Sequence, residues 1–496
     1  MVSNVTAFVP LTRQHRVLIL LGLGLLVAGM GLANAAIGHA NQLLPFLALF
    51  VLASVLAAPL LFYKSRWGLF HPLIFWVLWF GIFHEIIRKI PQFTVGLDRH
   101  IALPGVGEAE LARLVAYGVL LTALGFVAMY FGYMASPRPK VLKLTFAQPK
   151  YLVLKITAVA VFSTFSLLVL ANEMGGIDRL ALQRGLRSDM RAGAILGGHW
   201  TVAVGVLKTA CLVWLALRPD DWKRIVFICF FLFALLIGFI ATGSRGGLIM
   251  PVVLAGVILA LRYRKIRLGR SMVVGIVVGI FGLIALGVLG EFRSQSRGAE
   301  GLGDIQLELG LVGGAEQGLD SLTGYAGRSS GLYAILGRVP NQVDYLYGRS
   351  YLAIPAAPIP SRLWEDKPMA GGRLTGWLIF DRGMAGGGVP PGNIGEAYWN
   401  FGVLGVILVM FLFGIVLRWL AAFYEANNGA GWVVIIYVVS LFSLQPNSVS
   451  FYSWLHAIVP AIVLLVFFSG LPQSVKRAGN YGNIKNQFPH NSRDLN

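Results

Sequence analysis

The stretch Ile225–Thr242, with the sequence IVFICFFLFALLIGFIAT, contains no charged residue. An apolar stretch of this length spans the hydrocarbon core of a bilayer as a helix. A helix is favoured there because it satisfies its backbone hydrogen bonds internally. The whole chain has a matching composition, since 56% of its 496 residues are hydrophobic and 13% are charged, against roughly 25% charged residues in soluble domains. We therefore predict an all-α, polytopic membrane protein.

Similar apolar stretches on both sides of this one predict about twelve transmembrane helices. Their ranges are 17–36, 42–63, 69–87, 112–135, 151–172, 199–217, 225–242, 248–262, 271–291, 397–420, 431–445 and 452–470. A membrane β-barrel would instead show alternating segments of about ten residues. The chain then divides into membrane helices in 1–291, a large loop outside the cytoplasm in 292–396, further membrane helices in 397–470, and a tail in 471–496.

The orientation follows from lysine and arginine residues, which concentrate in short cytoplasmic loops. One alternate set of loops and tails carries a long series of such residues. They are Arg13, Arg16, Lys64, Arg66, Arg138, Lys140, Lys143, Lys150, Arg218, Lys223, Arg224, Arg262, Arg264, Lys265, Arg267, Arg270, Lys476, Arg477, Lys485 and Arg493. All of them fall on one side of the membrane if the helix ranges are right. Both termini are therefore expected in the cytoplasm.

The opposite set of loops is poor in lysine but rich in arginine, which topology alone does not predict. These arginines are Arg88, Arg99, Arg179, Arg184, Arg187, Arg191, Arg245, Arg293, Arg297, Arg328, Arg338, Arg349, Arg362, Arg373 and Arg382. A guanidinium group binds phosphate in a bidentate manner, whereas the lysine ammonium acts as a point charge. The pattern indicates an anionic ligand at the outer membrane surface. Pairing with lipid phosphates or with local carboxylates is the alternative.

Two short patterns strengthen this interpretation. Arg184, Arg187 and Arg191 share one face of a helix by their spacing, and three guanidinium groups on one face repel unless an anion lies among them. We predict that they bind a diphosphate; a solvated helix face is the alternative. Residues 243–247 read Gly-Ser-Arg-Gly-Gly between two predicted helices. Free backbone amides and Arg245 could form an anion site there, whereas the alternative is a tight hairpin with Arg245 reaching the headgroups.

Residues 359–368 and 392–402 form a third candidate region beside the tenth predicted helix. Trp364 and Trp399 offer flat apolar faces that suit sugar rings, and Glu396 lies at the mouth of the helix, where a carboxylate needs a partner. A helix N-terminal charge favoured by the dipole is the alternative for Glu396. Earlier in the chain, Glu85 has the spacing to pair with Arg88 or Lys89. No zinc spacing, phosphate-binding loop or dinucleotide fingerprint occurs.

Three of these segments carry a family resemblance. They are Pro360-Ser361-Arg362-Leu363-Trp364 with Lys367-Pro368, then Gly395-Glu396-Ala397-Tyr398 with Asn400-Phe401-Gly402, and Gly243-Ser244-Arg245-Gly246. Together with the topology they resemble the bacterial oligosaccharide repeat-unit polymerases, the O-antigen polymerases or Wzy-type proteins. In the first half of the chain the resemblance covers only topology and arginine-rich loops.

The resemblance implies a GT-C-like membrane glycosyltransferase in the bacterial inner membrane, with residues 292–396 as a periplasmic loop. Such an enzyme joins oligosaccharide units carried on undecaprenyl diphosphate and needs no metal and no cofactor. It implies membrane lipid, a chain-length regulator and a flippase as partners, and no nucleic acid. Because a diphosphate leaving group needs positive charge where negative charge develops, we expect Arg187, Arg191 and Arg245 to hold it, helped by Arg184, Arg297 and Arg362. Glu396 is the candidate general base or acceptor-orienting group, and Trp364, Lys367 and Trp399 are expected to bind substrate.

Two other functions remain open on the sequence. An O-antigen ligase would use the same donor with a different acceptor. A lipid-linked oligosaccharide transporter or flippase would also want cationic residues, but it should show related halves and charges deep in its helices. The predicted helices are nearly free of charge, and the loop 292–396 breaks any symmetry. These two features argue against the transporter, whereas the sequence separates the ligase from the polymerase poorly.

Overall fold

A computed structural model gives the arrangement of the chain. The structure describes Phe8, residues 11–176 with short gaps, Leu180, residues 198–263 apart from 243–244, residues 329–381 with short gaps, and residues 388–474 apart from 428. The predicted helix 271–291 lies outside the described residues.

The described residues are almost entirely helical. The helices before the large loop are α1 (Arg13–Ile37), α2 (Leu43–Leu61), α3 (Pro72–Trp76), η2 (Val77–Ile86), η3 (Ile87–Lys89), α4 (Ile90–Thr94), α6 (Glu108–Ala135), α7 (Leu152–Glu173), α9 (Gly198–Leu217), η5 (Pro219–Lys223), α10 (Ile225–Thr242) and α11 (Arg245–Tyr263). Those after residue 328 are α14 (Ser329–Arg338), α15 (Ala353–Ala356), α16 (Gly371–Leu374), η8 (Thr375–Ile379), α17 (Gly392–Ala426), α18 (Gly431–Ser443) and α19 (Ser448–Ser469).

The prediction of a polytopic α-helical membrane protein is confirmed. Among the described residues, 8 helices are long and apolar enough to cross a membrane, and α11 and α18 are shorter apolar helices. Every predicted range except 271–291 contains a described helix. The third range differs in detail, because α3 passes into the π-helical η2 and then into the 3-10 turn η3.

The tenth predicted helix differs more. It begins at Gly392 rather than at 397, and Phe401 and Gly402 interrupt it with non-helical backbone. Gly402 has a φ of 64°, which a glycine adopts without the steric strain that a Cβ atom would cause. The break divides α17 into a short first part and a long second part.

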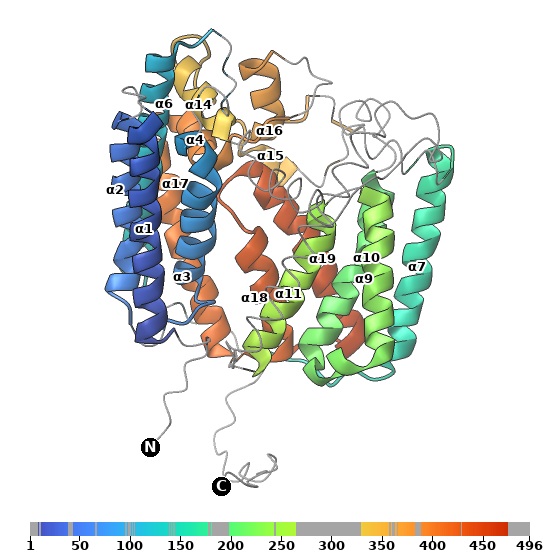
Figure 1. The fold of residues 1–496 in the computed structure, drawn as a ribbon. Helices are drawn as coiled ribbons and strands as arrows, with labels where there is room; N and C mark the ends of the chain where they lie inside the picture. The colour runs from blue at the N-terminus through green and yellow to red at the C-terminus, as the bar shows by residue number, and fades with distance from the viewer. Residues whose placement is uncertain are drawn as a thin grey trace, which may run out of the picture.

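Figure 1 shows two groups of helices side by side. In one group, α6 packs against α2 and α17, and α14 packs against both α6 and α17. In the other group, α9 contacts α7, α10, α11, α18 and α19. Contacts of α17 with α18 join the two groups. The helix α9 is therefore enclosed by its own group.

The described parts of the loops predicted to be cytoplasmic lie at the end of the bundle where α1 begins and α19 ends (Figure 1), which we call the terminal end. Basic side chains there satisfy carbonyl groups of other segments. The Lys155 ammonium donates to the carbonyl of Phe467 at 2.8 Å, and Arg218 donates to that of Pro149 at 2.8 Å. The short strands β1 (Leu144–Thr145) and β2 (Gln473–Ser474) also pair there. We call the opposite end the far end.

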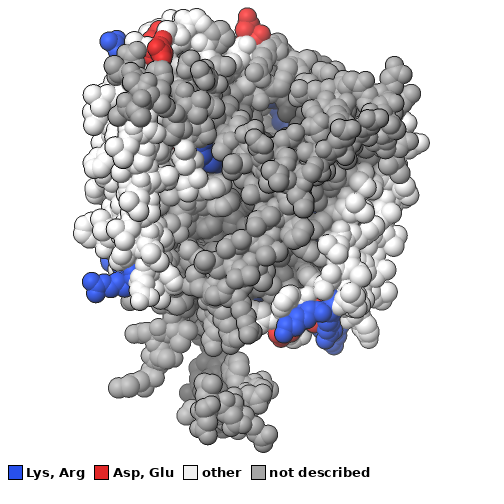
Figure 2. Space-filling view, viewed as in Figure 1, with Lys and Arg blue, Asp and Glu red and all other residues white. Residues whose placement is uncertain are grey.

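The surface agrees with a membrane-embedded belt. Figure 2 shows lysine or arginine together with aspartate or glutamate at both the far end and the terminal end, and mostly uncharged described residues between them. Large apolar side chains such as Leu25, Phe162 and Leu404 are exposed along this belt. Exposed apolar surface of this extent indicates contact with lipid rather than with water.

The closest helix contact joins α6 and α17 through two glycines. A Cβ atom on Gly132 would lie 1.9 Å from the carbonyl oxygen of Phe411, and one on Gly414 would lie 2.1 Å from that of Met129. Small residues allow this approach, and in lipid the resulting packing is a main source of helix association. Because α17 carries the far-end segments, this contact sets their position.

We expect Gly414→Ala to lower the thermal stability of the purified protein, because the added methyl group forces the two backbones apart. Overpacking of this kind costs about 1–3 kcal/mol. The matched control is Gly24→Ala in α1, where an added Cβ atom would meet nothing within 4 Å. Thermal unfolding in detergent measures both variants, and equal melting temperatures would contradict the packing.

Candidate functional site

The predicted site residues fall into two classes. Arg184, Arg187, Arg191, Arg297 and Arg362 lie outside the described residues, so their roles stay predictions. Arg245 is the first residue of α11 and therefore lies at the far end. The remaining predicted residues belong to α17 and to the segment that precedes it, which also lie toward the far end.

The break in α17 is covered by residues 344–348. Its unwound backbone leaves carbonyl groups without helical donors, and such groups are costly away from water. The amide of Leu346 donates to the carbonyl of Trp399 at 2.9 Å, and the amide of Tyr347 donates to that of Asn400 at 3.2 Å. The break therefore fixes the preceding segment onto the helix.

Glu396 lies in the first part of α17 and is completely buried. Its Oε2 atom accepts a hydrogen bond from the amide of Ser448, the first residue of α19, at 3.1 Å. The amide of Gly371 donates to the Ser448 hydroxyl at 2.9 Å. A Cβ atom on Gly371 would lie 2.7 Å from the carboxyl carbon of Glu396. Glycine at 371 is therefore what lets α16 lie directly over this carboxylate.

Two asparagines extend this contact along the same face of α17. Asn393, Glu396 and Asn400 are three or four residues apart and so lie on one side of the helix. The Asn400 amide nitrogen donates to the hydroxyl of Ser350 at 2.8 Å, and Asn393 bonds to Asn447. We call the set Asn393, Glu396, Asn400, Ser350, Gly371 and Ser448 the polar clasp. It ties the segment before α17 to both α17 and α19.

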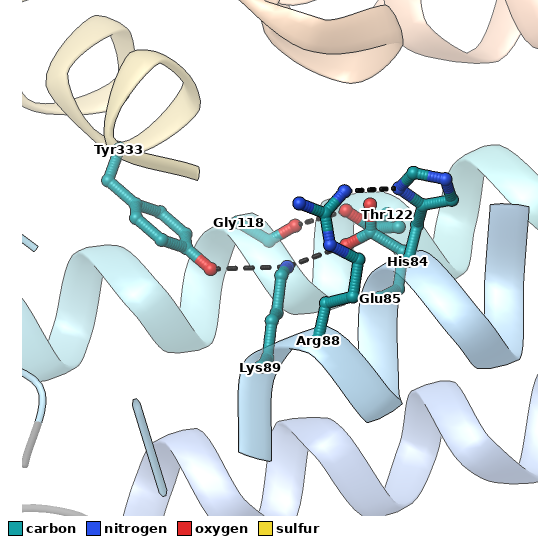
Figure 3. A network of polar contacts seen from close by, with 7 residues as sticks. All are labelled: His84, Glu85, Arg88, Lys89, Gly118, Thr122 and Tyr333. Carbon is teal, nitrogen blue, oxygen red and sulfur yellow. Dashed lines mark hydrogen bonds and ion pairs between the residues drawn. The ribbon is translucent and has the colours of Figure 1, made fainter. Parts of the chain in front are cut away.

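A second polar cluster lies beside α14 (Figure 3). The Lys89 ammonium forms an ion pair with Glu85 at 2.6 Å and donates to the Tyr333 hydroxyl at 3.3 Å. The prediction that Glu85 pairs with a basic residue of its own helix is confirmed, and the partner is Lys89. Arg88 and His84 lie next to this pair, with 3.1 Å between their nitrogens. Through Tyr333, the cluster fixes α14 to the membrane helices.

Trp399 differs from the expectation that it offers a face to a sugar, whereas Trp364 does not. Trp399 is 0% exposed, and its indole nitrogen donates to the carbonyl of Asp344 at 3.2 Å. Its ring is part of the core, so the structure gives it no free face for a sugar. Trp364 is 39% exposed and keeps an open face. The Lys367 ammonium donates to the carbonyl of Ile359 at 2.7 Å, which stiffens the turn beside Trp364.

Sequence reasoning missed one charged residue and half of the polar clasp. Lys208 lies midway along α9, although the predicted helices were judged nearly free of charge. A lysine within an apolar stretch is a signal that the sequence contains, since such residues are rare and usually functional. Ser350, Gly371 and Ser448 carry no comparable signal, because only the fold brings them to Glu396.

Comparison with known proteins identifies the family. The family model described as O-antigen polysaccharide polymerase Wzy matches residues 199–472. The matched region runs from α9 through α19 and includes Lys208, Arg245 and the whole polar clasp. No curated protein and no solved structure matches the chain.

The family match covers more than half of the 496 residues. Its members act in the membrane on lipid-linked oligosaccharide repeat units. The arrangement of apolar helices and the matched sequence agree, and the chain belongs to the O-antigen polysaccharide polymerase Wzy family.

Proposed function

We propose that this protein polymerises undecaprenyl-diphosphate-linked oligosaccharide units into O-antigen or exopolysaccharide at the periplasmic face of the inner membrane. A hydroxyl of the incoming unit attacks the anomeric carbon of the growing glycan, whose bond to the lipid diphosphate breaks. The hydroxyl proton passes to a base, and the lipid diphosphate leaves. The family match over residues 199–472 carries this proposal, and the reaction proceeds without a metal ion.

The orientation is part of the proposal. Lysine and arginine gather in cytoplasmic loops, and Lys155, Arg218 and Arg262 all bond to carbonyl groups at the terminal end. We therefore assign the terminal end, with both termini, to the cytoplasm and the far end to the periplasm. The described part of the loop 292–396 would then cover the periplasmic side of the membrane helices.

Positive charge at the far end would hold the lipid diphosphate. Arg245 begins α11, where backbone amides at a helix N-terminus also favour an anion. We propose Arg245 as the main ligand, with Arg184, Arg187, Arg191, Arg297 and Arg362 completing the site. Guanidinium groups placed in advance around the leaving group stabilise the charge that develops on it.

In this proposal Glu396 does not act as the base that contacts the sugar hydroxyl, and its role is indirect. Its burial in the polar clasp supports a role in orienting the acceptor side of the site, since it holds residues 350 and 371 against α17 and α19. Trp364 and Lys367, which lie on the same segment, would contact the sugars.

We expect Arg245→Ala to abolish long glycan chains in a polymerase-null host and Arg245→Lys to shorten them, because lysine keeps the charge but loses the bidentate contact. Gel analysis of glycan chain length measures this effect. The control is Arg113→Ala, since Arg113 is an exposed arginine near the start of α6. Full-length polymer from both Arg245 variants would remove Arg245 from the site.

The purified protein in detergent should extend a lipid-linked oligosaccharide without a sealed bilayer and without lipid A core as acceptor. This follows because glycan transfer, unlike transport, needs no second compartment. Mass spectrometry of the products measures chain extension. Product that forms only when lipid A core is added would indicate a ligase, and movement across liposomes without extension would indicate a transporter.

We expect Glu396→Gln to retain polymer formation, because glutamine still accepts a hydrogen bond from the Ser448 amide. Glu396→Ala should lower stability by about 1–3 kcal/mol, the usual cost of leaving a buried donor unsatisfied, and should shorten the glycan. Glu110→Ala, at an exposed position in α6, is the control. Loss of all polymer in a stable, well-expressed Glu396→Gln variant would instead indicate a general base.

A further inference from the structure

Lys208 is the eleventh residue of α9, a helix of 20 residues that runs across the membrane domain. At a rise of ~1.5 Å per residue it lies about 15 Å from the far end of the helix. That distance is about half the thickness of the hydrocarbon core. A lysine side chain is too short to cover it, so the ammonium group stays within the membrane.

Within the part of the chain that the structure describes, no side chain pairs with the Lys208 ammonium, whereas Lys89 and Arg224 each form an ion pair. An unpaired ammonium group in an apolar environment is strongly unfavourable. Lysines of this kind usually mark the path of an ion or a substrate. Among the described residues, Lys208 therefore has no counter-ion, and a ligand could supply one.

The direction of Lys208 follows from its neighbours on α9. The ring of Trp214 packs on Phe227 of α10, with 5.3 Å between ring centroids, and the carbonyl of Ala216 lies against Gly431 of α18. With 3.6 residues per turn, Lys208 lies about 120° from Trp214 on one side and about 80° from Ala216 on the other. The helix that contacts α9, α10 and α18 is α11. Lys208 therefore faces α11, which begins with Arg245.

Exposure changes along this face of α9. Toward the terminal end, Cys211, Leu212 and Leu215 are fully buried. Toward the far end, Gly205 is partly exposed, and a Cβ atom added there would meet only the Lys208 side chain, at 3.8 Å. The face is thus closed below Lys208, and above it Val204 is also buried, so the opening lies on the side of Gly205. A ligand would approach Lys208 from the far end.

We propose that Lys208 binds the phosphate groups of the lipid-linked substrate. Arg245 belongs to the same site at the far end of the membrane domain, and Lys208 is the cation that lies deepest in the membrane. This inference rests on the proposed function. The ligand class is a polyprenyl diphosphate, because only an amphipathic anion can bring a phosphate beside α11 while its chain stays in lipid. An anionic phospholipid shares this chemistry and is distinguished by experiment.

The test is direct binding of farnesyl diphosphate, a short polyprenyl diphosphate, to the full-length protein in detergent. Lys208→Met should weaken binding by at least about tenfold, the effect of losing one charge-assisted hydrogen bond, and Lys208→Arg should largely restore it. Lys150→Met, an exposed position at the terminal end, is the matched control and should bind normally. Thermal stability of Lys208→Met should be unchanged or higher, because a charge without a partner among the described residues is removed from the membrane domain.

Three further binding experiments identify the chemical class of the ligand. Farnesol should not compete, inorganic pyrophosphate should compete weakly, and phosphatidylglycerol should not discriminate between Lys208→Met and the unaltered protein. Normal farnesyl diphosphate binding by Lys208→Met, or an equal loss of phosphatidylglycerol binding, would overturn the assignment. If Arg245→Ala alone lost binding, the proposed function would stand without Lys208. If the unaltered protein bound no diphosphate and made no polymer, both the role of Lys208 and the proposed function would be wrong.

Discussion

The constraint on which this structure depends is that polar groups inside a membrane domain must find partners within the protein. The break in α17 is the clearest case. Phe401 and Gly402 free two carbonyl groups, and the amides of Leu346 and Tyr347 take them up. A local irregularity in one membrane helix therefore determines where a far-end segment docks. The polar clasp follows the same constraint through a side chain. The buried Glu396 carboxylate accepts a hydrogen bond from the Ser448 amide, and its position leaves room only for glycine at 371.

The same constraint separates structural polar groups from functional ones. Glu85 and Lys89 satisfy each other and Tyr333, so they need no ligand to explain them. The Oε2 atom of Glu396 is likewise met by the Ser448 amide, whereas its Oε1 atom has no hydrogen-bond partner among the described residues. Lys208 is not met by any described residue, and it faces the helix that starts with Arg245. Among the described residues, Lys208 is thus a cation without a protein partner, which suits an enzyme family that acts on lipid-linked oligosaccharides.

Much of the fold could be predicted because it depends on local composition. Stretches such as 225–242 predict their own helices, and the basic loops predict which ends lie together, as the contacts of Lys155 and Arg218 confirm. The site was less predictable because it depends on tertiary partners. From the sequence, Trp399 is expected to bind a sugar, but in the fold its indole nitrogen donates to the carbonyl of Asp344. The need for glycine at 371 is evident only from its contact with Glu396. Lys208 was visible in the sequence, but only the neighbours of α9 give its direction.

The central claim is that cations on α9 and α11 hold a lipid diphosphate at the far end of the membrane domain. An electron cryomicroscopy structure of the protein with a bound polyprenyl diphosphate tests it most directly. We expect density for the two phosphates between these helices, with Arg245 and Lys208 directed at it and the lipid tail among the membrane helices. Phosphate density on another part of the protein, with both side chains turned away, would contradict it.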